Sequence, residues 1–100
     1  MTIGVGLSPG LIEDFCKRHQ IRRLSLFGSV LRPDFRPESD VDVLVELEPG
    51  HRVGLIGFAR IERELGELIG RKVDLRTPGD LSPYFRDAVV RSAVVQYAAV

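Results

Sequence analysis

An apolar run broken by acidic residues constrains this chain more than any other feature. Residues 41–45 read Val-Asp-Val-Leu-Val and directly follow Asp40. In a β-strand, residues two apart lie on the same face of the sheet. The pattern therefore predicts a strand over residues 41–47, with Asp40 and Asp42 on one face and the alternate valines turned toward a core.

These two carboxylates predict a bound cation. Acidic groups held this close repel each other unless one is protonated or a cation lies between them. Mg²⁺ prefers hard oxygen ligands and is the usual ion where phosphates also bind. We therefore expect Mg²⁺ at Asp40 and Asp42, although such a pair, taken alone, is more often a solvated surface feature.

A third carboxylate follows in a second short strand. Residues 72–76 read Lys-Val-Asp-Leu-Arg, which predicts Val73 and Leu75 facing inward and Asp74 on the opposite face. If the two strands are neighbours, Asp74 lies beside Asp40 and Asp42. Three acidic side chains can hold two metal ions, the arrangement used for in-line displacement at phosphorus. The alternative is that Asp74 only marks the polar face of an edge strand.

A glycine–serine pair ends the strand predicted over residues 23–27. Gly28 would let the backbone approach a ligand closely. A short helix starting there would direct free N–H groups at an anion, and the Ser29 hydroxyl could donate to a phosphate oxygen. An ordinary turn is the alternative for Gly28 and Ser29 when they are considered alone.

Two further polar residues complete the predicted nucleotide site. Arg32 would fall on the same side of the short helix as Ser29, where it could pair with a phosphate; a surface ion pair is an equal alternative. Ser39 precedes the first aspartate and either contacts the nucleotide or braces the turn before Asp40. Pro33 follows Arg32 and limits the helix to a single turn.

The combined motif resembles the nucleotidyltransferases of the DNA polymerase β superfamily, in particular the minimal nucleotidyltransferase (MNT) group. It consists of Gly28-Ser29-x-x-Arg32, Ser39-Asp40-x-Asp42 and the later Asp74. The resemblance implies an α+β fold with a small mixed sheet of three to four strands flanked by helices. It also implies transfer of a nucleoside monophosphate from NTP, with ATP as substrate. In that reading Asp40, Asp42 and Asp74 are the catalytic ligands of two Mg²⁺ ions.

The same resemblance implies a protein partner. Many MNT proteins resemble antitoxins paired with a HEPN-domain toxin, which some of them silence by adding AMP to a tyrosine. We therefore expect a protein adenylyltransferase that modifies a hydroxyl of a HEPN toxin. A non-catalytic antitoxin that neutralises its partner by forming a complex is the alternative.

The remainder of the chain predicts three helices. The first runs from Pro9 to about His19, and the second covers about 55–69 and ends at the C-cap Gly70. The third begins at Ser82-Pro83 and continues to about Tyr97. Its small apolar residues surround the helix, which predicts a partner surface in addition to core contacts; packing into the core alone is an equal alternative.

Composition limits the class of protein. The 100 residues, 44% of them apolar, predict one globular domain over residues 1–100, and a formal net charge of zero gives no reason to expect a DNA or RNA ligand. The lone Cys16 excludes an internal disulfide and is expected to be buried. Residues 1–6 lack signal-peptide features, and no apolar run reaches the ~20 residues of a membrane span. A cytoplasmic protein is expected.

Overall fold

The structure, a computed structural model, describes residues 8–36 and 38–99. In chain order the elements are α1 (Pro9–Arg18), β1 (Ile21–Phe27), the 3₁₀ turn η1 (Gly28–Leu31), β2 (Val41–Leu47), α2 (Leu55–Ile69), β3 (Val73–Arg76), the 3₁₀ turn η2 (Pro78–Asp80), α3 (Arg86–Ser92) and β4 (Val94–Ala98). The expectations for residues 1–6, and the parts of the loop and tail predictions that fall on Pro37 and Val100, lie outside the described residues.

The four strands form one mixed sheet in the order β3-β2-β1-β4. β1 is antiparallel to both β2 and β4, whereas β2 and β3 are parallel. Parallel neighbours need a crossover connection, and α2 supplies it between β2 and β3. The predicted α+β fold with a small mixed sheet flanked by helices is confirmed.

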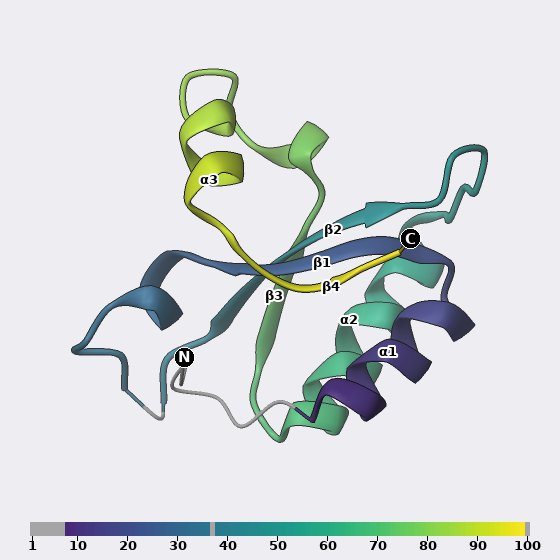
Figure 1. Cartoon of the computed structure of the whole chain (residues 1–100), viewed down its shortest axis with the longest axis horizontal. Helices are drawn as coiled ribbons and strands as arrows, with labels where there is room; N and C mark the ends of the chain where they lie inside the picture. The colour runs from purple at the N-terminus through teal and green to yellow at the C-terminus, as the bar shows by residue number, and fades with distance from the viewer. Residues whose placement is uncertain (1–7, 37, 100) are drawn as a thin grey trace.

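The hydrophobic core lies between α1, α2 and one face of the sheet. Figure 1 shows these two helices on one side of the strands and α3 on the other. The alternation expected for the strands is present: the core contains Leu24, Leu26, Val41, Val43, Val45, Val73 and Leu75, which pack with Ile12, Phe15, Ile61 and Leu65 of the helices. Alternate residues therefore face the opposite side, where Asp42 lies.

Cys16 is fully buried in this core. Burial raises the pKa of its thiol to about 12, because the apolar surroundings disfavour the thiolate. The side chain is therefore protonated at neutral pH and acts as a small hydrophobic residue, as expected from the sequence.

The two long helices agree with the sequence prediction. Pro9 occupies the first turn of α1, and α2 spans Leu55–Ile69 as predicted. Gly70 ends α2 in the left-handed conformation, with φ +70°. None of the helices within residues 8–36 and 38–99 combines the length and hydropathy of a membrane span.

The prediction of a third helix reaching Tyr97 is wrong. α3 ends at Ser92, Ala93 is extended, and residues 94–98 form β4. β1 has a free edge at this position, and β4 fills it by pairing Leu26 with Val94 and Leu24 with Tyr97. The β-branched residues of this segment favour a strand, so backbone pairing prevails over helix continuation. The nearly all-apolar helical surface inferred from the sequence does not exist.

Candidate active site

Two of the predicted acidic residues meet across the parallel strands. Asp42 of β2 is in register with Asp74 of β3, and each is the second residue of its strand. Because the flanking residues of both strands are buried in the core, Asp42 and Asp74 lie together on the opposite face. Asp40 lies immediately before β2 and is more exposed. The expected adjacency of the two strands is confirmed.

Gly28 lies directly against one of these carboxylates. It follows β1, whose last residue, Phe27, pairs with Asp42. A β-carbon added at Gly28 would overlap Oδ2 of Asp42 and lie 3.2 Å from its Cγ. The residue also has φ +74°, a conformation that glycine adopts without steric cost. Both the turn and the close approach therefore require glycine.

The surroundings of Asp42 disfavour the ionised form of its carboxylate. Burial raises its pKa most, the negative charge of Asp74 raises it next, and Asp40 adds a smaller contribution. The backbone N–H of Ser29 donates a hydrogen bond to Asp42 and opposes these effects, as does the charge of Arg76. The three aspartates therefore concentrate negative charge in one region of the sheet, and a bound cation would reduce the repulsion between them.

Basic side chains of the protein contact the other two aspartates. Arg76 places Nε 3.1 Å from Oδ1 of Asp74 and a terminal nitrogen 3.4 Å from Oδ2. Lys72 Nζ lies 4.0 Å from an oxygen of Asp40. Across residues 8–36 and 38–99, no three acidic, histidine or cysteine side chains converge on one metal position. The three aspartates therefore share one region of the sheet without forming a closed cage.

The donor set nevertheless fits a divalent cation. It consists of carboxylate oxygens, one of which belongs to a half-buried group with a raised pKa, and it lies beside a backbone bend that a β-carbon would fill. Hard oxygen ligands of this kind suit Mg²⁺. The side chain that would have to exchange partners is Asp74, since Arg76 now holds it.

Sequence reasoning missed Arg76. The signal was available, because Arg76 is two residues beyond Asp74 in the same strand and alternation places both on one face.

The turn after Gly28 is short, as the proline predicted. η1 covers only Gly28–Leu31, and Arg32 leaves it in an extended conformation before Pro33. Arg32 is exposed at the end of this turn and Ser39 is half-buried. The structure brings Gly28 and Ser29 to Asp42, whereas it records no side-chain bond from Arg32 or Ser39 to the aspartates among the described residues.

Arg71 organises the loop that leads to Asp40, a role that no sequence pattern indicates. Its guanidinium donates to the carbonyl oxygens of Arg36 at 2.9 Å and Ser39 at 3.3 Å. It also lies 4.7 Å from the ring centre of Phe35, within the range of a cation–π contact. Ser39 is therefore held through its backbone.

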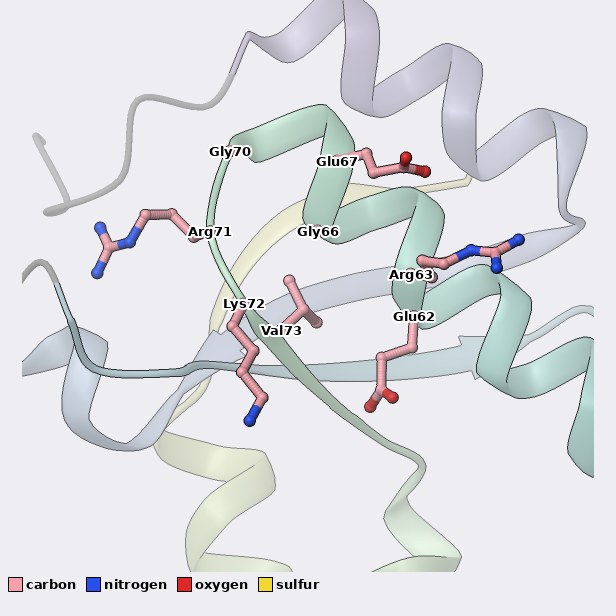
Figure 2. A pocket seen from close by; sticks show the side chains of 8 residues that line it. All are labelled: Glu62, Arg63, Gly66, Glu67, Gly70, Arg71, Lys72 and Val73. Atoms are coloured by element: carbon pink, nitrogen blue, oxygen red, sulfur yellow. The ribbon is translucent and has the colours of Figure 1, made fainter.

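A cavity of about 440 Å³ lies elsewhere, between the end of α2 and the start of β3. Lys72, Glu62 and Arg71 are among its lining residues, and none of the predicted aspartates lines it. Figure 2 shows the Arg71 and Arg63 side chains extending in opposite directions. Because these charges do not converge, the cavity is a poorer candidate site than the acidic face of the sheet.

Comparison with known proteins identifies the family. The family model described as "Nucleotidyltransferase domain" matches residues 9–95, which include every predicted site residue. The chain belongs to this family of nucleotidyltransferases, as the motif resemblance implied, and is an enzyme by class.

Individual relatives agree with this assignment. The protein adenylyltransferase MntA of Thermococcus cleftensis is 33% identical over 82 residues, which cover 82% of this chain and 81% of the relative. A solved structure described as a candidate minimal nucleotidyltransferase is 36% identical, with a TM-score of 0.70 and 86% of each chain covered.

A more distant structure shares the fold. It is a complex described as a tri-AMPylated HEPN toxin with an MNT antitoxin from Shewanella oneidensis. The match has a TM-score of 0.64 and 18% identity, and covers 91% of this chain and 70% of the other. At this identity the similarity demonstrates a common fold.

Proposed function

We propose that this protein transfers AMP from ATP to a hydroxyl group, a tyrosine side chain, of a HEPN-domain toxin, and so acts as its antitoxin. The observation that carries the proposal is the contact between Gly28 and Asp42 beside Asp74. This contact brings the acidic residues next to the backbone bend at Gly28, which could accept a phosphate group. The names of the relatives supply the class of acceptor. Because ATP is the donor, we expect the reaction to take place in the cytoplasm.

Asp40, Asp42 and Asp74 are the proposed ligands of two Mg²⁺ ions. The chemistry that these ions supply when bound is neutralisation of charge on the attacking oxygen and the leaving pyrophosphate. The residues themselves orient the donor: Asp42 is fixed by the backbone N–H of Ser29, and Asp74 by its place in the adjacent strand. A fixed acidic centre reduces the reorganisation needed during the reaction.

The proposed step is an in-line substitution at the α-phosphorus of ATP. The acceptor oxygen forms a new P–O bond, the bond to the β-phosphate oxygen breaks, and pyrophosphate leaves. Asp74 accepts the proton that the acceptor hydroxyl loses. The products are an AMP phosphodiester on the acceptor and pyrophosphate, so that no oxidant or reductant is required.

The backbone at Gly28 and Ser29 is the proposed contact for the β- and γ-phosphates. The absence of a β-carbon at Gly28 permits close approach, and the Ser29 hydroxyl can donate to a phosphate oxygen. We place Arg32 and Ser39 at the edge of this nucleotide site. Arg32 is exposed and able to reach a phosphate only from outside the turn.

A non-catalytic antitoxin is the second candidate. Large apolar side chains remain exposed in the segment that follows η2 and in β4: Tyr84 is 93% exposed, Phe85 63% and Val95 51%. Exposed apolar groups that gather on one segment suit a protein partner. Neutralisation by complex formation alone would use such a surface without the acidic centre.

The test is transfer of label from α-labelled ATP to a purified HEPN-domain toxin. We expect Mg²⁺-dependent labelling that is lost in Asp40→Asn/Asp42→Asn. Glu46→Gln is the matched control, because Glu46 lies in the same strand but pairs with Arg23. Full neutralisation of the toxin by the double variant, without labelling, would favour the non-catalytic candidate.

A further inference from the structure

We propose that Arg76 is a built-in counter-ion of the active site, which holds the Asp74 carboxylate in the metal-free protein and must release it when a divalent cation binds. The inference builds on the proposed function, because it assumes that Asp74 is a metal ligand. It assigns to Arg76 a positioning role that controls metal affinity.

The ion pair between Arg76 and Asp74 is bidentate, and we call it the Arg76–Asp74 clasp. Two nitrogens of one guanidinium approach the two oxygens of one carboxylate, at 3.1 and 3.4 Å. A bidentate contact of this kind is more specific in its geometry than a single hydrogen bond. Both oxygens of Asp74 are engaged, so a cation that approaches either oxygen meets the positive charge of the guanidinium and competes with it.

The position of Arg76 follows from the strand. It lies two residues after Asp74 in β3, so both side chains belong to the face that carries Asp42. β3 ends at Arg76 and is an edge strand. The Arg76 side chain is 48% exposed and that of Asp74 37%, so the guanidinium can swing into solvent without unfolding the sheet.

The charges around Asp42 and Asp74 explain why a permanent cation such as Arg76 is useful at this site. Asp42 is half-buried and in register with Asp74, and the guanidinium of Arg76 is bound to Asp74 beside it. Arginine remains protonated at all physiological pH values, so it supplies this positive charge permanently. Removing it leaves the aspartates with more unbalanced negative charge, which a divalent cation would then neutralise.

Arg76 and a divalent cation therefore compete for Asp74, which predicts the direction in which metal affinity changes when Arg76 is removed. Loss of the guanidinium should tighten metal binding, because Asp74 is free and no positive group has to be displaced. For a partly exposed but forked ion pair, we expect the dissociation constant for Mn²⁺ to fall about three- to tenfold in Arg76→Gln.

The experiment is calorimetric titration of the whole protein with Mn²⁺ alone, comparing wild type, Arg76→Gln and Arg23→Gln. Arg23 is the matched control: it also forms an ion pair between neighbouring side chains of the sheet, with Glu46 at 3.3 Å, and does not contact Asp74. Tighter binding in Arg76→Gln alone supports the clasp. Unchanged or weaker binding in Arg76→Gln, or equal tightening in both variants, would overturn it.

A second measurement on the wild-type protein avoids any folding defect of the variant. The Nε–H resonance of Arg76, followed by NMR during titration with Mg²⁺, should shift as its hydrogen bond to Asp74 is lost. A resonance that stays fixed while Asp42 responds to Mg²⁺ would contradict the clasp. Failure of wild type and Arg76→Gln alike to bind either ion would instead contradict the proposed metal site itself.

Discussion

A β-carbon at Gly28 would overlap the Asp42 carboxylate, so only glycine fits at this bend without displacing that side chain. Two elements that are distant in sequence are joined here: the bend after β1 and the start of β2. The backbone proposed to contact phosphate and the proposed metal ligand are therefore in direct contact, and a change in either should disturb the other.

Replacement of Gly28 by alanine should be costly for two reasons. The positive φ angle disfavours any β-carbon by about 1 kcal/mol, and the new methyl group would displace the Asp42 carboxylate. We expect a total loss of about 2–3 kcal/mol in the free energy of unfolding, measured by urea denaturation, together with weaker ATP binding.

Gly50→Ala separates the two contributions. Gly50 also has a positive φ angle, +82°, but a β-carbon there would meet nothing within 4 Å. It should therefore lose only the conformational part and bind ATP normally. Equal losses of stability in the two variants would show that the contact with Asp42 is unimportant.

Asp42→Asn should stabilise the metal-free protein near neutral pH. Burial and the neighbouring aspartates raise the pKa of Asp42 above its ordinary value of 3.8, so the folded state binds its proton more tightly than the unfolded state does. The stability that comes from this proton is complete below the ordinary pKa and is lost as the pH rises through the raised one. Asparagine avoids that loss while keeping an oxygen for the Ser29 N–H.

The measurement is the difference in unfolding free energy between Asp42→Asn and wild type across the pH range. It should be positive near neutral pH and shrink toward zero as the pH falls below 3.8, the ordinary pKa of this group. Glu46→Gln, in the same strand, should show no such gain, since Glu46 is paired with Arg23. A pH-independent difference for Asp42→Asn would contradict the electrostatic explanation.

Much of this site could be predicted from local sequence because it depends on strand periodicity. Alternation placed Asp42 and Asp74 on the polar face of their strands, and the crossover helix made those strands parallel neighbours. The single-turn helix after Gly28 followed from Pro33. These features are decided within a few residues, where backbone geometry leaves few choices.

The features that could not be predicted depend on contacts between distant segments. β4 was mistaken for a helix because its pairing partner, β1, is about seventy residues earlier, and short apolar runs do not distinguish the two structures. Arg71 holds the loop before Asp40 through carbonyl groups of Arg36 and Ser39, which carry no sequence signal.

Glu62 should prove important for the position of Asp74. Its carboxylate accepts a hydrogen bond of 2.8 Å from the backbone N–H of Leu75, which ties α2 to the free edge of β3. Glu62→Ala should cost about 1–2 kcal/mol in unfolding free energy, because it leaves a partly buried N–H without this acceptor. Glu62→Gln should restore most of the loss, and Glu67→Ala, at an exposed position of the same helix, should be neutral.

The two tyrosines test the placement of β4. Tyr97 pairs with Leu24 and packs against the core, whereas Tyr84 is 93% exposed. Tyr97→Ala should cost about 2 kcal/mol of stability and Tyr84→Ala less than about 0.5 kcal/mol, both by urea denaturation. A neutral Tyr97→Ala would argue against the strand pairing.

A crystal structure with Mn²⁺ and a non-hydrolysable ATP analogue tests the central claim most directly. We predict an anomalous signal within about 2.0–2.6 Å of carboxylate oxygens of Asp42 and Asp74, with the triphosphate against Gly28 and Ser29. A nucleotide bound with its metal away from this acidic face, for example in the cavity of Figure 2, would contradict the proposed active site.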